Sequence, residues 1–378
     1  MDFELTEEQK IMQETIRNFA KNELEPVADE LDQAEEFPWK NFKRMAELGL
    51  TGMILPAEYG GSDTGELSLS IATEEIGKAC ASSAHLLDSH LLLCANSIYH
   101  FGNEEQRQRF LPPLAKGEKV GAFGLTEPDA GSDVSNLQLK AVKDGDNYIL
   151  DGQKTFISNG EVCETAIVFA SIPELAPRGM TAFVVEIRTP GFTKGKKFKK
   201  LGMRAATTAE LFFEDCRVPS ANRIGEEGKG MRIALSTLDR GRIGIAAQAV
   251  GIARAVLEKC TEYSKQRIQF GAPISQNQAI AWKLADMATE IEAARFLYYK
   301  AAYLADKGEP FSTNAAMAKV YAAELAMKAA TWGIQIFGGY GYMMEYPMQR
   351  YFRDAKVTEI YEGTSEVQRM IISRAVLS

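Results

Sequence analysis

Four polar segments that contain glycine interrupt otherwise apolar stretches, and they carry the side chains best suited to chemistry. They are residues 125–134 (LTEPDAGSDV), 238–243 (LDRGRI), 263–271 (YSKQRIQFG) and 360–366 (IYEGTSE). The first places two hydroxyls, three carboxylates and a glycine within ten residues; such groups bind polar ligands or move protons. Each segment also has an ordinary structural explanation: a solvated turn, a helix start, a helix that ends at Gly271, and a helix cap at Thr364. Taken separately, none of the four establishes a function.

The motifs of common nucleotide and metal sites are absent from the sequence. The run GGYG at 338–341 lacks the remaining spacing of a dinucleotide fingerprint, and GEEGKG at 225–230 lacks the spacing and final hydroxyl of a phosphate loop. There is no HExxH or GxSxG motif, and the five cysteines form no CxxC pair. The three histidines, at 85, 90 and 100, gather in one apolar segment, where packing is favoured over ligation. We therefore expect no metal site and no disulfide framework.

The elements that must position these segments follow the order helix, strand, helix. Thr6 and Gln9 form a predicted capping box, and apolar residues then recur at helical spacing. A second helix is expected near 39–48, and the apolar stretch 67–101 predicts one or two buried helices. From residue 230 to the end the helical period returns, with many alanines that allow long helices to pack closely.

The middle of the chain lacks the helical periodicity of the two ends. Short runs of β-branched and aromatic residues, separated by Gly, Pro, Asn and Asp, predict strands. These runs lie at 147–158, 165–171, 180–187 and 209–213. No helical pattern alternates with them, so an antiparallel sheet or barrel is expected rather than a parallel βαβ fold.

Composition and charge limit the class of protein. The 378 residues suggest about two or three structural units, and a hydrophobic content of 46% with 25% charged residues is that of a globular chain. The net charge of −8 argues against a general nucleic-acid binder. The N-terminus is acidic, and no apolar stretch is long enough for a membrane span. We expect a soluble protein, or the mature form of an imported one.

Together, seven segments resemble those of the acyl-CoA dehydrogenase family, in the family's order and at its distances. They are LTEPDAGSD, KTFISNG, LGMRAATTAEL, LDRGRIGIAAQA, SKQRIQFG, QIFGGYGY and IYEGTSEVQ. The resemblance covers the whole chain and is greatest to bacterial short-chain, butyryl-type members. It implies an α+β, mainly α, fold: an N-terminal helical domain at 1–119, a middle antiparallel β-domain at 120–228 and a C-terminal four-helix bundle at 229–378. A cytoplasmic location, or the mitochondrial matrix for an imported form, is expected with it.

The resemblance also implies FAD, bound between the β-domain and the bundle and completed by a neighbouring subunit of a homotetramer. The residues expected around the flavin ring are Leu125, Thr126, Gly131, Ser132, Phe156, Ile157 and Ser158. Those expected to hold the pyrophosphate and adenosine from the partner chain are Arg267, Phe270, Gln278, Gln335, Ile336, Phe337, Gly338 and Gly339, with Thr364, Ser365 and Glu366 completing the set. The family usually has an aromatic residue before Gln278, where this chain has Asn277.

The implied reaction is α,β-dehydrogenation of a thioester, in which a carboxylate removes the α proton while hydride leaves to the flavin. Glu362 matches the family's base, and Gly363 follows it in the same turn. Isovaleryl- and long-chain-type members place the base beside the CoA-binding arginine instead, where this chain has Gly241. Coenzyme A is expected to meet Ser132, Asp239 and Arg242, and Gly363 is a further expected substrate contact.

The acyl group is left open by the sequence. Asp88 and His90 are unusual in the segment expected to line the acyl pocket, and Asp88 is a candidate substrate contact. Linear short, branched and cyclic chains all fit, including a cyclohexanecarboxyl-type substrate that uses Asp88. The expected electron acceptor is an electron-transferring flavoprotein. Alternatives are an acyl-CoA oxidase, disfavoured because oxidases of this fold are typically longer, and a non-catalytic acyl-CoA-binding scaffold.

Overall fold

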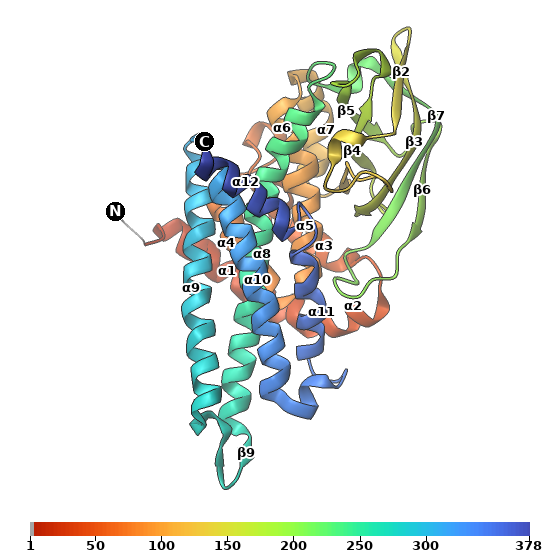
Figure 1. Ribbon diagram of the computed structural model, residues 1–378. Helices are drawn as coiled ribbons and strands as arrows, with labels where there is room; N and C mark the ends of the chain where they lie inside the picture. The colour runs from red at the N-terminus through yellow and green to blue at the C-terminus, as the bar shows by residue number, and fades with distance from the viewer. Residues whose placement is uncertain (1–3) are drawn as a thin grey trace.

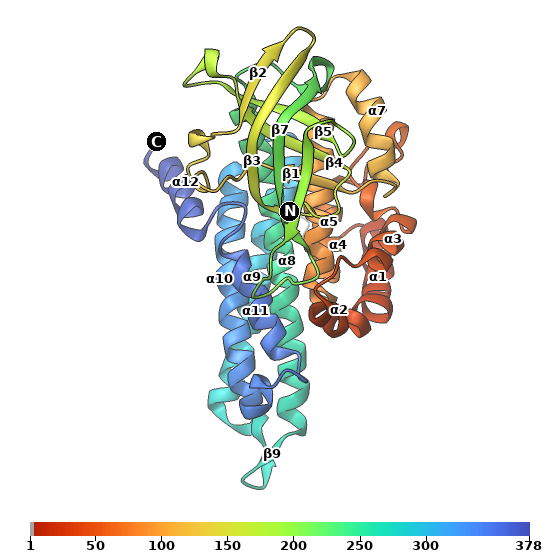
Figure 2. The same cartoon turned by 90° about the vertical axis from the view of Figure 1, so that its right-hand side faces the viewer.

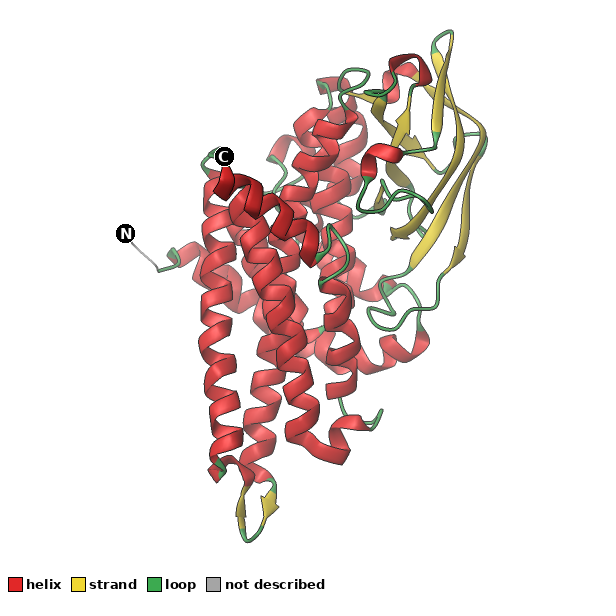
Figure 3. Ribbon diagram, viewed as in Figure 1, coloured by secondary structure: helices red, strands yellow, loops and turns green. Residues whose placement is uncertain are grey.

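The computed structural model describes residues 4–378, so the first three residues of the expected N-terminal domain lie outside the described part. Helices precede and follow a β-domain, as predicted. The long helices of the last part run side by side, the sheet lies at one end of them, and the N-terminal helices pack along their flank (Figures 1 and 2). Colouring by secondary structure separates the sheet from the helical remainder (Figure 3).

The N-terminal part is helical throughout. Its α-helices are α1 (Glu7–Phe19), α2 (Ala28–Ala34), α3 (Trp39–Glu47), α4 (Gly65–Ala79), α5 (Ala81–Asp88), α6 (Asn96–Phe101) and α7 (Glu104–Ala115). The capping box at Thr6 and Gln9 is present. The apolar stretch breaks at Cys80, whose backbone is extended, and a π-helix at Ser89–Ala95 joins α5 to α6. Such π turns shift which side chains face a neighbouring site.

The β-domain is one eight-stranded sheet. Its strands are β1 (Gly121–Gly124), β2 (Lys140–Asp144), β3 (Asn147–Ser158), β4 (Thr165–Ser171), β5 (Met180–Glu186), β6 (Phe192–Lys197), β7 (Thr208–Pro219) and β8 (Arg223–Ile224). The order is β6-β7-β3-β2-β4-β5-β8, with β1 added beside β4. The pairs are antiparallel except that β1 and β2 each run parallel to β4.

The C-terminal part is a bundle of long helices. Its elements are α8 (Gly230–Gln266), the hairpin β9 (Ile268–Gln269) and β10 (Ala272–Pro273), α9 (Gln278–Asp306), α10 (Ser312–Phe337), α11 (Met348–Thr358) and α12 (Ser365–Leu377). Residues 238–243 therefore lie inside α8, and α8 ends at Gln266, before Gly271. Alanines buried along α10 face α8, as the composition predicted. Small side chains let the two helix backbones approach closely.

Candidate active site

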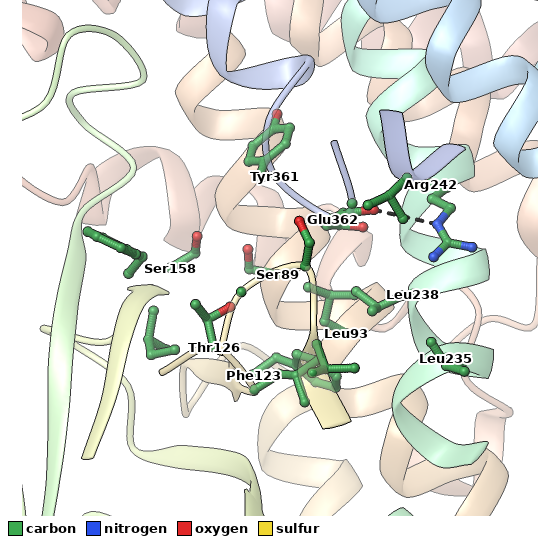
Figure 4. A pocket seen from close by; sticks show the side chains of 18 of the residues that line it. Ser89, Leu93, Phe123, Thr126, Ser158, Leu235, Leu238, Arg242, Tyr361 and Glu362 are labelled. Atoms are coloured by element: carbon green, nitrogen blue, oxygen red, sulfur yellow. Dashed lines mark hydrogen bonds between the residues drawn. The ribbon is translucent and has the colours of Figure 1, made fainter. Parts of the chain in front are cut away.

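A cavity of about 180 Å³ lies where the β-domain meets α8 and the turn before α12. The predicted flavin and substrate residues on its wall are Leu125, Thr126, Gly131, Ser132, Phe156, Ile157, Ser158, Arg242, Glu362 and Gly363. Figure 4 shows Glu362 between Arg242 on one side and the hydroxyls of Thr126 and Ser158 on the other. Segments more than 200 residues apart in the sequence thus form one wall.

Glu362 lies on a turn that other side chains fix from behind. Its φ of 53° and the φ of 90° at Gly363 are left-handed, a conformation that glycine adopts without strain but glutamate does not. Gln368 donates from Nε2 to the Glu362 carbonyl at 3.2 Å and to the Gly363 carbonyl at 2.8 Å. Lys319 Nζ, reaching from α10, donates to the same Gly363 carbonyl at 2.7 Å. The turn therefore holds a strained residue in one orientation.

The Glu362 carboxyl group is buried and receives no hydrogen bond from a backbone, amide, hydroxyl or cationic donor of the described residues. A Cβ at Gly241 would overlap its Oε2 atom, so the glycine leaves the space that this carboxyl group fills. Burial raises the pKa of Glu362, and the hydrogen bond with Asp88 and the charges of Lys319 and Arg242 oppose that rise. A carboxylate with little solvation and a raised pKa is a suitable general base.

Asp88 lies behind the cavity wall rather than on it. The wall is formed instead by His85, Ser89 and Leu93, which follow one another at four-residue spacing on the same helical face. His90 points into the core, where Nε2 contacts the Leu114 carbonyl at 3.0 Å and Nδ1 accepts from the backbone of Gly121. His90 therefore packs in the core, as the apolar segment around it favours, and it does not line the cavity.

His85 is a site residue that the sequence reasoning treated as packing. Its Nε2 lies 2.8 Å from Ser158 Oγ, and its ring stacks on Tyr361 with centroids 4.6 Å apart. Its Nδ1 is buried without a partner among the described residues. Burial lowers the pKa of His85 to about 3, so the ring is neutral. The only feature of the sequence that could have indicated a place for His85 at the site is its four-residue spacing to Ser89.

Arg242 is anchored from behind by a carboxylate. Its guanidinium pairs with Asp239 one turn earlier on α8, and Asp239 also accepts from Ser312 Oγ at 2.9 Å. Arg242 Nε donates to the Glu362 carbonyl at 3.5 Å (dashed in Figure 4). Asp239 is not on the wall of the cavity. Asp239 therefore orients Arg242, and Arg242 is the member of the pair that lines the cavity.

A buried ion pair holds the loop after β1 against β3, and the sequence reasoning missed it. Lys154 Nζ lies 2.6 Å from Glu127 Oε1 and 3.1 Å from the Leu125 carbonyl. Glu127 Oε1 also accepts from the backbone of Leu139 at 3.0 Å. Because both charges are partnered, the pair can stay buried, and it places Leu125, Thr126 and the hydroxyl of Ser132 at the cavity.

The remaining predicted residues lie far from this cavity or outside both cavities. A second cavity of about 670 Å³ near the far end of the bundle is lined by Arg267, Ile336, Phe337, Gly338 and Gly339. Phe270 lies at the tip of the β9–β10 hairpin with its ring fully exposed. The walls of the two cavities do not include Gln278, Gln335, Thr364, Ser365, Glu366 and Asp239. At 1.5 Å per residue, Arg242 and Arg267 are about 37 Å apart along α8.

The residues of the two cavities fit two different parts of FAD, the flavin ring and the diphosphate. The first cavity offers the hydroxyls of Thr126, Ser132 and Ser158 and a partly exposed Phe156 ring, a donor set suited to the edge of a flavin ring. The second offers the Arg267 guanidinium beside two glycines at which an added Cβ would meet nothing, which lets a diphosphate approach the backbone. No helix within residues 4–378 is long and apolar enough to cross a membrane.

Three family models together match nearly the whole chain. They are the N-terminal (residues 6–118), middle (122–216) and C-terminal (228–377) domains of acyl-CoA dehydrogenase. The short-chain specific acyl-CoA dehydrogenase of Clostridium acetobutylicum is 50% identical over 99% of both chains. The NADH-dependent acryloyl-CoA reductase of Anaerotignum propionicum is 49% identical over 100% of this chain and 96% of its own.

Solved structures agree with these matches. The butyryl-CoA dehydrogenase of Megasphaera elsdenii superimposes with a TM-score of 0.98 at 48% identity over all of both chains. A chain solved in work on the electron transferring flavoprotein of Acidaminococcus fermentans matches with a TM-score of 0.98 at 49% identity, again over both chains in full. The prolyl acyl carrier protein oxidase AnaB has a TM-score of 0.95 at 34% identity over 99% of this chain and 100% of its own.

The fold and the flavin-type cavity define an FAD-dependent oxidoreductase, and a glutaryl-CoA dehydrogenase of Mycobacterium smegmatis in the same structural group was solved with FADH2. The chain belongs to the acyl-CoA dehydrogenase family. It is therefore an acyl-CoA dehydrogenase that uses FAD. The match to AnaB corrects one expectation: an oxidase of this fold has nearly the same length, so chain length does not separate the two classes.

Proposed function

We propose that this enzyme removes the α and β hydrogens of a short-chain acyl-CoA, with Glu362 as the base that takes the α proton. The observation that carries the proposal is the position of the Glu362 carboxyl group. It is buried on a fixed turn at the cavity wall, opposite Thr126 and Ser158, and no backbone, amide, hydroxyl or cationic group of the described residues donates to it. FAD, when bound, supplies the two-electron acceptor for the β hydrogen.

Other residues of the chain bind and orient the substrate and the cofactor. Arg242, oriented by Asp239, offers a charge to the phosphate or pantetheine groups of CoA. The hydroxyls of Ser132 and Ser158 offer hydrogen bonds to substrate and flavin edges. Burial of the Glu362 carboxyl group limits its contact with water, which strengthens these interactions.

A small acyl group is favoured by the limited size of the cavity and by the short-chain names of the relatives. A second candidate is an acyl chain that is cyclic or carries a polar group. It is favoured by the His85 Nδ1 and Ser89 Oγ atoms, which are buried at the wall without partners among the described residues.

FAD is proposed to lie across an interface between two copies of the chain in a homotetramer. The reason is the separation of about 37 Å between the two half-sites along α8, which exceeds the reach of one dinucleotide. The Arg267 half-site of one copy would then complete the Thr126 half-site of another.

An electron-transferring flavoprotein is proposed as the oxidant of the reduced enzyme, supported by the similarity to the chain from the Acidaminococcus fermentans work.

The test of the acyl substrate mixes purified yellow enzyme anaerobically with butyryl-, isobutyryl- and cyclohexanecarboxyl-CoA and follows flavin bleaching. Bleaching fastest with butyryl-CoA supports the first candidate, and fastest with the cyclic thioester supports the second. The reduced enzyme is then mixed either with the flavoprotein or with oxygen. Stoichiometric hydrogen peroxide, formed as fast as the flavoprotein is reduced, would assign an oxidase instead of a dehydrogenase.

A further inference from the structure

The carboxyl group of Asp88, behind the cavity wall, meets that of Glu362, which lies on the wall. Asp88 ends α5, and Glu362 lies on the turn before α12. All four carboxyl oxygens are buried and have no other partner among the described residues, and the two groups lie close enough for a hydrogen bond with each other. Since two carboxylates cannot donate to each other, this hydrogen bond requires a proton on one of them.

Two glycines of α8 create the space for this pair. A Cβ at Gly241 would overlap Glu362 Oε2, and a Cβ at Gly244 would overlap Asp88 Oδ1. The two positions are three residues apart and so lie on one face of the helix. The other atoms nearest to these positions belong to the side chains of Leu92 and Leu93, so an apolar side chain borders each gap. The helix thus presents one carboxyl-sized gap for each group.

The charges around the pair are distributed unequally. Glu362 faces Arg242 from α8 and Lys319 from α10, which both favour its ionised form. Asp88 faces Glu362 and, from α4, Glu66, and both disfavour its ionised form. Glu66 is itself paired with Arg240 at 2.6 Å. The neighbouring Tyr361 hydroxyl is directed elsewhere, to Gln248 Oε1 at 2.6 Å. The negative charge therefore belongs on Glu362 and the proton on Asp88.

We propose that Asp88 is a positioning residue that remains protonated and donates a hydrogen bond to the Glu362 carboxylate. The inference rests on the proposed role of Glu362 as the base. Before the reaction the pair holds one proton and one negative charge. When Glu362 takes the α proton from the substrate, the pair holds two protons and is neutral, and the Asp88 proton does not move. Asp88 thus binds one oxygen of the base and leaves the other for the substrate.

Burial and then the Glu362 carboxylate raise the pKa of Asp88 well above its usual value, in agreement with this assignment. The alternative is an ionised Asp88 that repels Glu362. The two arrangements predict opposite effects of neutralising Asp88, because a lost donor raises the pKa of Glu362 whereas a lost negative charge lowers it.

The test is the pH profile of flavin reduction in Asp88→Asn and Asp88→Ala holoenzymes. We expect the Asn variant, which still donates from its amide, to keep the acidic limb of the wild-type profile. The Ala variant should shift that limb to higher pH. A shift to lower pH in both variants, or no shift in the Ala variant, would overturn the proposal.

A second measurement keeps the test independent of turnover and of folding of the Ala variant. Infrared spectra at neutral pH should contain the C=O stretch of a buried protonated carboxyl group in wild type and in Glu362→Gln, and lack it in Asp88→Asn. A band that persists in Asp88→Asn would contradict the assignment. The proposed function is tested separately: if Glu362→Gln reduces its flavin at nearly the wild-type rate, Glu362 is not the base.

Discussion

Lys319 of α10 donates a hydrogen bond to the Gly363 carbonyl, and so ties the core of the bundle to the turn that carries Glu362. The lysine is completely buried, and burial lowers its pKa to about 8. Its charge in turn opposes the raised pKa of Glu362. One side chain therefore both fixes the turn and favours the ionised form of the base.

Replacing Lys319 with Met should loosen the turn and remove this charge. We expect flavin reduction to slow by about 10- to 100-fold, the cost of misplacing a catalytic group. The acidic limb of the profile should move to higher pH, because Glu362 loses a nearby cation. Stopped-flow bleaching across pH measures both effects. Lys328→Met is the matched control, since Lys328 lies on the same helix in an exposed ion pair with Glu290. Equal behaviour of the two variants would refute the prediction.

Replacing Glu362 with Gln keeps the shape and removes the basicity. Flavin reduction should fall by about 10²–10⁴-fold, as expected for loss of a general base, while FAD and acyl-CoA still bind. Anaerobic bleaching gives the rate, and the spectral shift on mixing gives binding. Glu105→Gln, at an exposed position of α7, serves as the control. Nearly wild-type bleaching by Glu362→Gln would mean that another group takes the proton, and Asp88 would become the leading candidate, with 1,4-elimination on a cyclic substrate.

Gly241 offers a second route to the same point in the cavity. A side chain built there starts at the place that Glu362 Oε2 occupies, so Gly241→Glu requires that the original side chain be removed. We expect Glu362→Gly to be nearly inactive and the double variant with Gly241→Glu to regain part of the rate. Gly241→Gln in the same background is the control, because it has the size without the basicity. Equal rates for the Glu and Gln double variants would show that the carboxylate does not reach the α carbon.

Arg267 should matter for FAD although it lies far from Glu362. Loss of its charged hydrogen bonds to a diphosphate removes about 1.5–3 kcal/mol, or about 10- to 100-fold in affinity. The flavin-to-protein ratio after gel filtration of Arg267→Ala measures this effect, and light scattering reports the oligomer. Lys265→Ala, an exposed cation near the end of the same helix, is the control. Full FAD retention by Arg267→Ala would place the adenosine half elsewhere.

Asp88 should make folding stability depend on pH. Its folded pKa lies well above the unfolded value of 3.8, so its stabilising contribution is complete below that value and declines as pH rises toward the folded pKa. The loss is about 1.4 kcal/mol per pH unit over this interval. Asp88→Asn should therefore be more stable than wild type at neutral pH, with the advantage disappearing near pH 4. Thermal melts of both proteins at several pH values provide the measurement, and parallel curves would contradict it.

The order of elements and most of the cavity wall were predictable from the sequence. The capping box at Thr6, the strand at 147–158 and the helical period of the ends follow from local residue patterns, which do not depend on distant contacts. The motifs that resemble the acyl-CoA dehydrogenase family also identified Thr126, Ser158, Arg242 and Glu362, which the fold brings to one cavity. Strands β1, β2, β6 and β8 were not among the predicted runs; β1 begins and ends with glycine, β2 and β6 are rich in lysine, and β8 has two residues.

Only the tertiary structure decided which side chains of the helix at 81–95 face the site. A one-residue difference on a helix turns a side chain by about 100°, and the π turn after Asp88 changes the phase again, so Asp88, Ser89 and His90 point to three different surroundings. The meeting of Asp88 with Glu362, 274 positions later in the chain, depends on two glycines of a third segment that leave room for both. The protonation of that pair is set by burial and by the cations on one side of it, and these are properties of the packed chain.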